Sequence, residues 1–157
     1  MRRKDRLVTD VQQIERILSG CDVCRIAMID GGTPYIVPMN FGYTFQDSVI
    51  TLYFHCAGEG RKIDVLKSNP SVCVEMDCGH HLITAETACG YTMEFESIIG
   101  SGRVEFLTEP AEKKHALNQM MKQFSDRTDF TYEDKMLGLV TVFKITLEEY
   151  AAKRLSR

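Results

Sequence analysis

Residues 55–62, HCAGEGRK, bring together residue types that often carry chemistry in proteins: a histidine, a cysteine, two glycines and two adjacent cations. A histidine beside a cysteine can form a nucleophilic couple or bind a metal ion. Glycines followed by cations can bind an anion through backbone N–H groups and positive side chains. The segment is therefore a candidate catalytic couple, metal site or phosphate site, and a plain polar loop is the alternative.

The two cations of this segment, Arg61 and Lys62, stand at the start of a predicted helix over 62–67 and follow Gly58 and Gly60. Positive side chains at a helix N-terminus oppose the helix dipole, so their position is locally unfavourable. A bound anion would reverse this, because it would meet the cations, the free backbone N–H groups and the dipole together. The pattern predicts either an anion site or a solvated basic first turn, and it is looser than a Walker motif.

His55 and Cys56 are adjacent at the end of a predicted strand, where consecutive side chains point to opposite sides. They are therefore poor partners for a catalytic couple, which requires the two side chains to meet. We expect one of them to face a ligand and the other to face the protein interior. For His55 alone, a polar residue that simply ends a strand is an equally good interpretation.

The six cysteines offer a second candidate site, because Cys21 and Cys24 form a C-x-x-C pair. A structural zinc ion needs four ligands, and Cys78, His80 and His81 could complete the set. Against this, Cys24 begins an apolar strand, and free cysteine is among the most buried residue types. Buried thiols are the preferred interpretation, and no metal site is predicted.

Hydrophobic periodicity and turn residues predict a chain dominated by strands. Strands are expected over 23–29, 34–45, 49–54, 71–77, 91–107 and 139–150, and helices over 11–20, over 62–67 and from Pro110 onward, with 78–90 ambiguous and 125–134 a polar loop. Pro34 and Pro38 limit backbone pairing and predict an edge strand or a bulge. Gly100 and Gly102 are the expected bulge points of the long strand. The pattern favours a mainly β fold, a β-barrel with flanking helices, in one domain over residues 1–157.

Composition excludes several classes of protein. The chain is 44% hydrophobic and 26% charged with a net charge of −3, which argues against general nucleic-acid binding. It has no apolar run long enough to span a bilayer and no signal-peptide pattern, so we expect a cytoplasmic protein with reduced thiols. Basic residues cluster near the two ends, Arg2, Arg3, Lys4 and Arg6 at the start and Lys153, Arg154 and Arg157 at the end. The first cluster is interpreted as a solvated terminus, and the interpretation of the second stays open.

Several segments, in this order and at this spacing, resemble one family. They are PYIVPMNFGY (34–43), LYFHCAGEGRKIDVLKSNPSVCVEMD (52–77) and SIIGSGRVEFL (97–107), with MRRKDR (1–6) and CDVCRIAM (21–28) adding to the match. The chain is similar to the pyridoxamine 5′-phosphate oxidase-like flavoproteins, and more narrowly to the branch of the nitroimidazole-resistance (Nim) proteins. The resemblance implies an FMN-binding split β-barrel and a homodimer with the flavin at the interface.

The resemblance also assigns roles to individual residues. Arg61 and Lys62 would hold the FMN phosphate, and His55 and Cys56 would lie beside the flavin, with His55 the candidate catalytic residue. The other implied flavin neighbours are Val37, Pro38, Met39 and Asn40 along the ring edge, Ser97 near the ring or ribityl chain, and Tyr150 and Lys153 reaching the flavin of the partner. Residues 151–154, AAKR, lack a glycine that the branch often has after the aromatic residue.

The activity implied is that of an FMN-dependent oxidoreductase acting on a small molecule, such as a nitroimidazole-type nitro compound, with a reduced nicotinamide as donor. Two alternatives stay open. One is a non-catalytic flavin- or haem-binding module, because a fold does not fix a function. The other is a true pyridoxamine 5′-phosphate oxidase, although the extra basic residues that bind its substrate phosphate have no counterpart that we can place in this chain.

Overall fold

The computed structural model describes residues 3–156, so Arg2 and Arg157 of the two basic ends lie outside the described residues. The strands are β1 (Leu7–Val8), β2 (Cys24–Asp30), β3 (Thr33–Met39), β4 (Gly42–Gln46), β5 (Val49–Ala57), β6 (Ser71–Ile83), β7 (Thr92–Leu107) and β8 (Val140–Leu155). The helices are α1 (Val11–Gly20), α2 (Arg61–Ser68), α3 (Pro110–Phe124) and α4 (Asp134–Leu139), with short 3₁₀ turns at Lys4–Arg6 and Ala88–Gly90. The fold is mainly β, as the sequence predicts.

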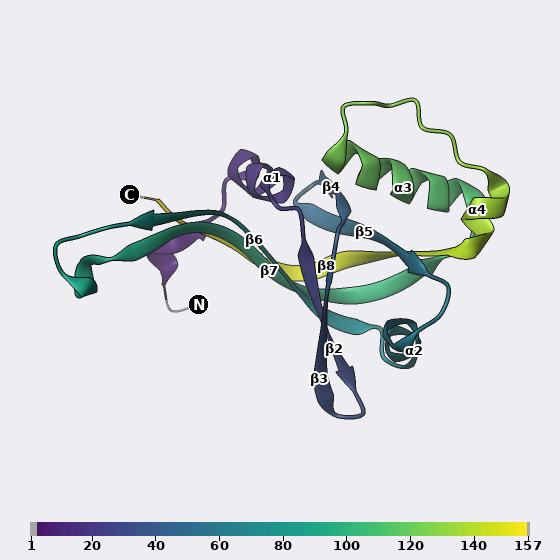
Figure 1. The fold of residues 1–157 in the computed structure, drawn as a ribbon, viewed down its shortest axis with the longest axis horizontal. Coiled ribbons are helices and arrows are strands. Elements are labelled where there is room, and N and C mark those ends of the chain that lie inside the picture. The colour runs from purple at the N-terminus through teal and green to yellow at the C-terminus, as the bar shows by residue number, and fades with distance from the viewer. Residues whose placement is uncertain (1–2, 157) are drawn as a thin grey trace.

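The strands form one antiparallel sheet in the order β3-β2-β6-β7-β8-β5-β4, with β1 added to β8. The long strands β6, β7 and β8 are its centre, and the β6–β7 hairpin extends away from the body while the β2–β3 hairpin extends in another direction (Figure 1). The prediction of an edge position for the proline-containing strand is confirmed, because β3 lies at one end of the sheet. A register shift between Ser101 and Gly102 confirms a bulge at the second predicted point.

The main core lies inside the curved sheet and under α1. Its largest fully buried side chains include Phe41, Phe54 and Phe143, and the rings of Phe54 and Phe143 stack at 5.2 Å. Asp10 caps α1 by accepting a hydrogen bond from the Gln13 backbone N–H at 2.9 Å, and the buried face of this helix closes the core. This core fixes which face of each strand points inward.

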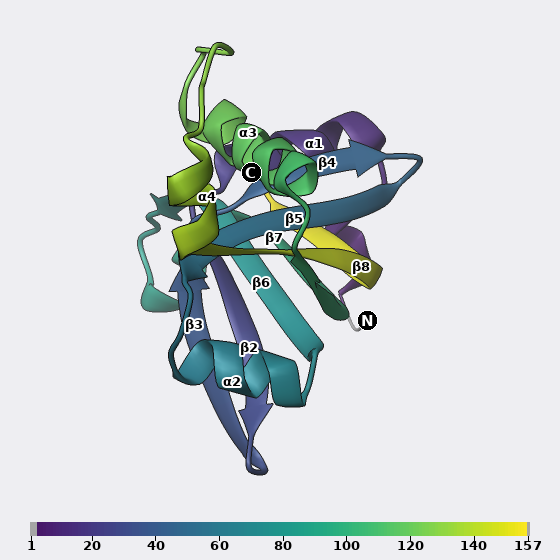
Figure 2. The same ribbon diagram turned by 90° about the vertical axis from the view of Figure 1, so that its right-hand side faces the viewer.

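A second, smaller core lies on the outer face of the sheet, where α3 covers β4 and β5 (Figure 2). Tyr53 of β5 and Val142 of β8 pack there against Ala116 and Met120 of α3. Tyr53 and Phe54 are both buried but belong to different cores, so β5 is covered on both faces. His55 follows two residues after Tyr53 and therefore shares the α3 side of the strand.

The structure differs from the sequence prediction in several elements. The segment 34–45 is two strands, separated at Asn40 and Phe41, and β3 and β4 lie at opposite edges of the sheet. Phe41 is fully buried in the main core. The strand is interrupted at this residue because its side chain turns into the core. The last strand runs to Leu155, the ambiguous segment 78–90 is strand as far as Ile83, and the short elements β1 and α4 were not predicted.

Within the described part of the chain, every helix is too short or too polar to span a lipid bilayer.

Candidate functional site

The N-terminus of α2 exposes backbone donors. Gly60, the residue before the helix, has a φ of 129°, a conformation that side-chain-bearing residues rarely adopt, and a Cβ added there would meet open space. Its carbonyl accepts from the N–H groups of Ile63 at 2.8 Å and Asp64 at 3.2 Å. The N–H groups of Arg61 and Lys62 have no acceptor among residues 3–156, and no side chain caps the helix. These free donors suit an anion.

Arg61 links this helix to the turn of the β2–β3 hairpin. Its Nε donates to Asp30 Oδ2 at 2.7 Å, and its guanidinium carbon lies 4.3 Å from the centre of the Tyr35 ring. The ion pair is exposed, and pairs of this kind contribute at most about 1 kcal/mol. These contacts therefore hold the Arg61 side chain near the N-terminus of α2, and a bound anion could replace them.

Lys62 is half-buried and faces the end of β5. It forms no ion pair within the described residues. Burial raises the pKa of the Cys56 thiol, and the nearby Lys62 ammonium opposes that rise. The first turn of α2 and the end of β5 thus lie close together, with an uncompensated positive charge between them.

The end of β5 presents His55 and Cys56 on opposite sides, as predicted. Cys56 packs against the main core, whereas His55 is exposed and lines a pocket on the α3 side. The two side chains are not a catalytic couple in this structure. His55 is the one that a small molecule can reach.

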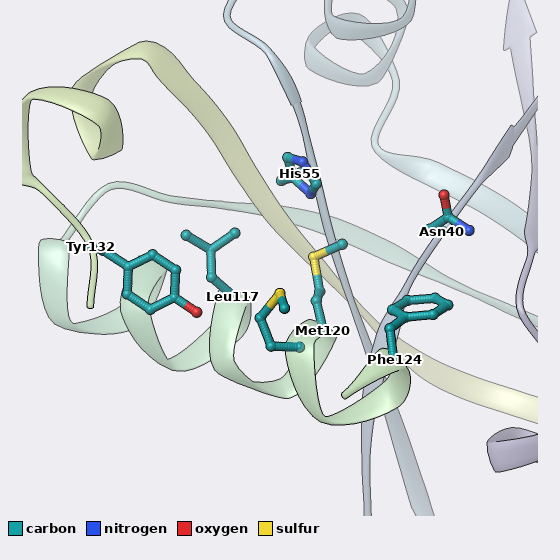
Figure 3. Close-up of a pocket in the computed structure, with 7 residues that line it drawn as sticks. Asn40, His55, Leu117, Met120, Phe124 and Tyr132 are labelled. Atoms are coloured by element: carbon teal, nitrogen blue, oxygen red, sulfur yellow. The ribbon is translucent and has the colours of Figure 1, made fainter. Parts of the chain in front are cut away.

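The pocket that His55 lines has a volume of about 410 Å³ and is mostly apolar. Figure 3 shows Leu117, Met120 and Phe124 pointing from α3 toward His55 on β5 and Asn40 in the segment between β3 and β4. Tyr132 reaches in from the loop after α3, and its hydroxyl donates to Asn118 Oδ1 at 2.9 Å. A pocket with an apolar wall and a few polar groups is typical of small-molecule sites.

The α3 wall of this pocket was not predicted in the sequence analysis, which expected only a helix from Pro110 onward. Met120 is buried, but Met121 is half-buried and Phe124 is 48% exposed, and all three line the pocket. The signal in the sequence was the apolar stripe of Leu117, Met120, Met121 and Phe124, which by itself does not distinguish core packing from a pocket wall.

Residues 37–40 lie on the edge strand β3 and the residue after it. Val37 and Met39 pack against the main core, whereas Pro38 and Asn40 are exposed. Asn40 donates through Nδ2 to the Asp22 carbonyl at 2.9 Å and lines the same pocket as His55. Within the described residues β3 pairs only with β2, so its outer edge has backbone groups available to a ligand.

Three predicted residues lie elsewhere. Ser97 and Lys153 are directly opposite each other in the β7–β8 ladder. Tyr150 is opposite Gly100, and its hydroxyl donates to the Ser48 carbonyl at 3.2 Å. None of them lines the His55 pocket, whose described lining includes His55 and Asn40 of the predicted set.

The cysteines do not assemble a metal site within residues 3–156, where no group of three His, Cys, Asp or Glu side chains is placed to hold an ion. Cys21 and Cys24 are fully buried in the main core. Burial raises the pKa of both thiols, that of Cys24 to about 12. They are protonated, packed side chains at neutral pH.

The curled antiparallel sheet, with α2 at its open edge and α3 over its outer face, defines a split β-barrel with a ligand pocket. The sequence model described as pyridoxamine 5′-phosphate oxidase matches residues 10–154. The chain belongs to this family, which confirms the resemblance seen in the sequence. The comparison with curated proteins gave no match.

Solved structures agree with this assignment. A candidate 5-nitroimidazole antibiotic resistance protein from Bacteroides thetaiotaomicron is 38% identical with a TM-score of 0.82, over 94% of this chain and 86% of that one. The flavocytochrome Anf3 of Azotobacter vinelandii is 18% identical with a TM-score of 0.81, and the match covers 100% of this chain and 72% of that one. An FAD- and haem-binding protein of Mycobacterium smegmatis is 14% identical with a TM-score of 0.84, and the match covers 97% of this chain and 74% of that one. At such identities the last two show the fold alone.

Proposed function

We propose that the protein binds FMN and acts as an oxidoreductase on a small molecule. One observation carries the proposal: the start of α2, with its free backbone N–H groups and two cations, follows directly on the strand that places His55 in the apolar pocket. A ligand with a phosphate at Arg61 and Lys62 would therefore have its ring system beside His55 and the edge of β3. Membership of the family and the flavin-binding names of two structural relatives support flavin as that ligand.

The residues present fit an FMN phosphate. Gly60 leaves open space where a side chain would stand. Within residues 3–156, the N–H groups of Arg61 and Lys62 lack acceptors and the Lys62 ammonium forms no ion pair. Charge-assisted hydrogen bonds of this kind contribute about 1.5–3 kcal/mol each. Arg61 would join them after exchanging Asp30 for the phosphate.

Bound flavin would supply the electron transfer, taking electrons from a reduced nicotinamide and passing them to the acceptor. The chain itself would exclude water with the α3 wall and supply a proton from His55. An apolar wall opposite a proton donor favours a flat, weakly polar acceptor such as a nitroaromatic compound. The name of the Bacteroides relative supports this acceptor class.

We further propose a homodimer. Ser97, Tyr150 and Lys153 lie outside the His55 pocket, so they would serve a flavin only if it were bound by a second copy. Exposed Ile36 and Ile99 on β3 and β7 are apolar surface that a second copy would cover. Light scattering coupled to size-exclusion chromatography should give twice the monomer mass.

The absorption spectrum of the purified protein, before and after incubation with FMN, is the deciding test. A flavin spectrum whose extracted cofactor is identified as FMN by mass supports the proposal, and a protein that stays colourless in both cases contradicts it. Stopped-flow reduction by NADH or NADPH, followed by reoxidation with a nitroimidazole, tests the activity. A bound flavin that no acceptor reoxidises faster than oxygen does would favour a binding module, and turnover of pyridoxamine 5′-phosphate would favour the oxidase.

A further inference from the structure

The apolar wall of the His55 pocket ends at a second polar group, the hydroxyl of Tyr132. The wall runs along α3 from Leu117 to Phe124, which is about 10 Å of helix. Tyr132 meets α3 at the Leu117 end, where its hydroxyl donates to Asn118 Oδ1 at 2.9 Å. Figure 3 shows Tyr132 beside Leu117, with Phe124 at the opposite end of the wall. The pocket thus has a polar group that the proposed function does not yet use.

The position of Tyr132 is fixed by the segment that follows it. Lys114 Nζ of α3 lies 3.3 Å from Asp134 Oδ1, two residues after Tyr132. Lys113 Nζ, also on α3, donates to the Leu137 carbonyl of α4 at 2.8 Å. Together with the hydrogen bond of Tyr132 itself, these contacts attach the segment to α3. The place of the hydroxyl in the pocket is therefore defined by the fold.

The Tyr132 hydroxyl has an acceptor site left for a ligand. Its single proton is donated to Asn118, and a phenol oxygen can also accept hydrogen bonds. Among residues 3–156 no group donates to this oxygen, and Tyr132 is half-buried where it lines the pocket. Burial raises the pKa of Tyr132, so the hydroxyl stays protonated at neutral pH. The oxygen can therefore accept from a ligand that carries a hydroxyl or amino group.

The other polar side chains of the pocket are His55 and Asn40. Asn40 Nδ2 already donates to the Asp22 carbonyl, whereas His55 is exposed. In the proposed function His55 supplies a proton, so it meets the end of the substrate that accepts one. In a nitroaromatic compound this end is the nitro group, which donates no hydrogen bond. The remote end of the same molecule is then available to Tyr132.

We propose that Tyr132 is a specificity-determining residue that selects nitroaromatic substrates with a hydroxyl or amino group remote from the nitro group. The nitro group in this inference rests on the proposed function, and the remote donor rests on the pocket alone. A pocket of about 410 Å³ has room for such a substituent, since drug-sized ligands occupy pockets of about 300–1,000 Å³. One neutral hydrogen bond changes affinity about 2- to 12-fold.

Two neutral ligands of nearly equal shape test the proposal. 4-Nitrobenzyl alcohol carries a hydroxyl where 1-ethyl-4-nitrobenzene carries a methyl group. Each is titrated into the protein with FMN in excess, and binding is followed by the methyl resonances of Met120 and Met121, which line the pocket. The ratio of the two dissociation constants, ethyl compound over alcohol, should fall about 2- to 12-fold from the wild type to Tyr132→Phe. Tyr91→Phe, at an exposed tyrosine outside the pocket lining, is the control and should keep the ratio.

The ratio separates recognition of the ligand from a purely structural role of Tyr132. Its change measures the coupling between the hydroxyl of the ligand and that of Tyr132. If Tyr132 only anchors its loop through Asn118, Tyr132→Phe weakens both ligands equally and the ratio stays at the wild-type value. That result would overturn the proposal, as would methyl resonances that neither ligand shifts.

The orientation of the bound alcohol is a second readout, which needs no variant. Nuclear Overhauser effects from its methylene protons to the Tyr132 ring support the proposal, and effects to the His55 ring instead would refute it. Because both measurements report binding, they are independent of turnover. A protein that selects the alcohol through Tyr132 but reduces no nitro compound would contradict the oxidoreductase alone. Turnover with an unchanged ratio would contradict the role of Tyr132 alone.

Discussion

Arg61 donates a hydrogen bond from Nε to Asp30 Oδ2 at 2.7 Å, and this contact joins the first turn of α2 to the tip of the β2–β3 hairpin. The same guanidinium is a predicted ligand of the flavin phosphate. Asp30 therefore competes with the phosphate for Arg61. We predict that Asp30→Asn raises FMN affinity by up to about fivefold, the limit set by the small contribution of an exposed ion pair. Fluorescence titration of the apoprotein with FMN measures this affinity. Weaker FMN binding by Asp30→Asn than by the wild type would mean that Asp30 positions Arg61 for the phosphate.

Removing the cations of the α2 start should have the opposite effect. Lys62→Ala is expected to weaken FMN binding about 10- to 150-fold, because a charge-assisted hydrogen bond to phosphate is lost. Lys67→Ala, in the last turn of the same helix, is the matched control and should bind FMN normally. Equal FMN affinities of the Lys62→Ala and Lys67→Ala variants would mean that the start of α2 does not bind the phosphate.

His55 should affect turnover more than binding. We predict that His55→Asn lowers kcat for nitro-compound reduction by about 10²-fold or more, as loss of a general acid does. Its flavin spectrum and FMN affinity should change little, since the phosphate contacts remain. His115→Asn, on α3 and in edge contact with Tyr53 at 5.7 Å, is the control. An unchanged kcat in His55→Asn would mean that His55 lines the pocket without donating a proton.

The seating of α3 against β4 depends on one glycine. A Cβ at Gly42 would overlap the α3 backbone at Gln119 and Met120, which cannot move aside as a flexible side chain could. We predict that Gly42→Ala lowers the free energy of unfolding by about 1–3 kcal/mol or more. Gly138→Ala, whose Cβ meets nothing within 4 Å, should be neutral or stabilising by up to about 1 kcal/mol. Urea unfolding compares the two, and equal stabilities would contradict the close contact.

The buried thiols should make stability depend on alkaline pH. The pKa of Cys24 is raised to about 12 from an ordinary value of 9.0, and that of Cys21 is also raised, so the native state keeps protons that the unfolded state releases. Stability is full below pH 9 and should fall as pH rises toward 12. The fall in urea midpoint between pH 8 and pH 11 should be smaller in Cys21→Ala with Cys24→Ala than in the wild type. Identical pH profiles would mean that the two thiols do not contribute.

The sequence by itself determined the features that depend on neighbours along the chain. Alternation along a strand separated His55 from Cys56, and Gly60 before Arg61 and Lys62 predicted a possible anion site that stays a prediction, because both patterns are local. Prolines without N–H groups predicted an edge strand, and β3 occupies that edge. Family resemblance added the fold, which the structure shares.

Only the tertiary structure decided which distant segments meet. The break at Phe41 follows from its burial in the main core, and the α3 wall follows from packing on Tyr53, both results of long-range contact. The pairing of β1 with β8 joins segments from the two ends of the chain. No local pattern encodes such contacts, because their free energy comes from burial and charge between residues far apart in sequence.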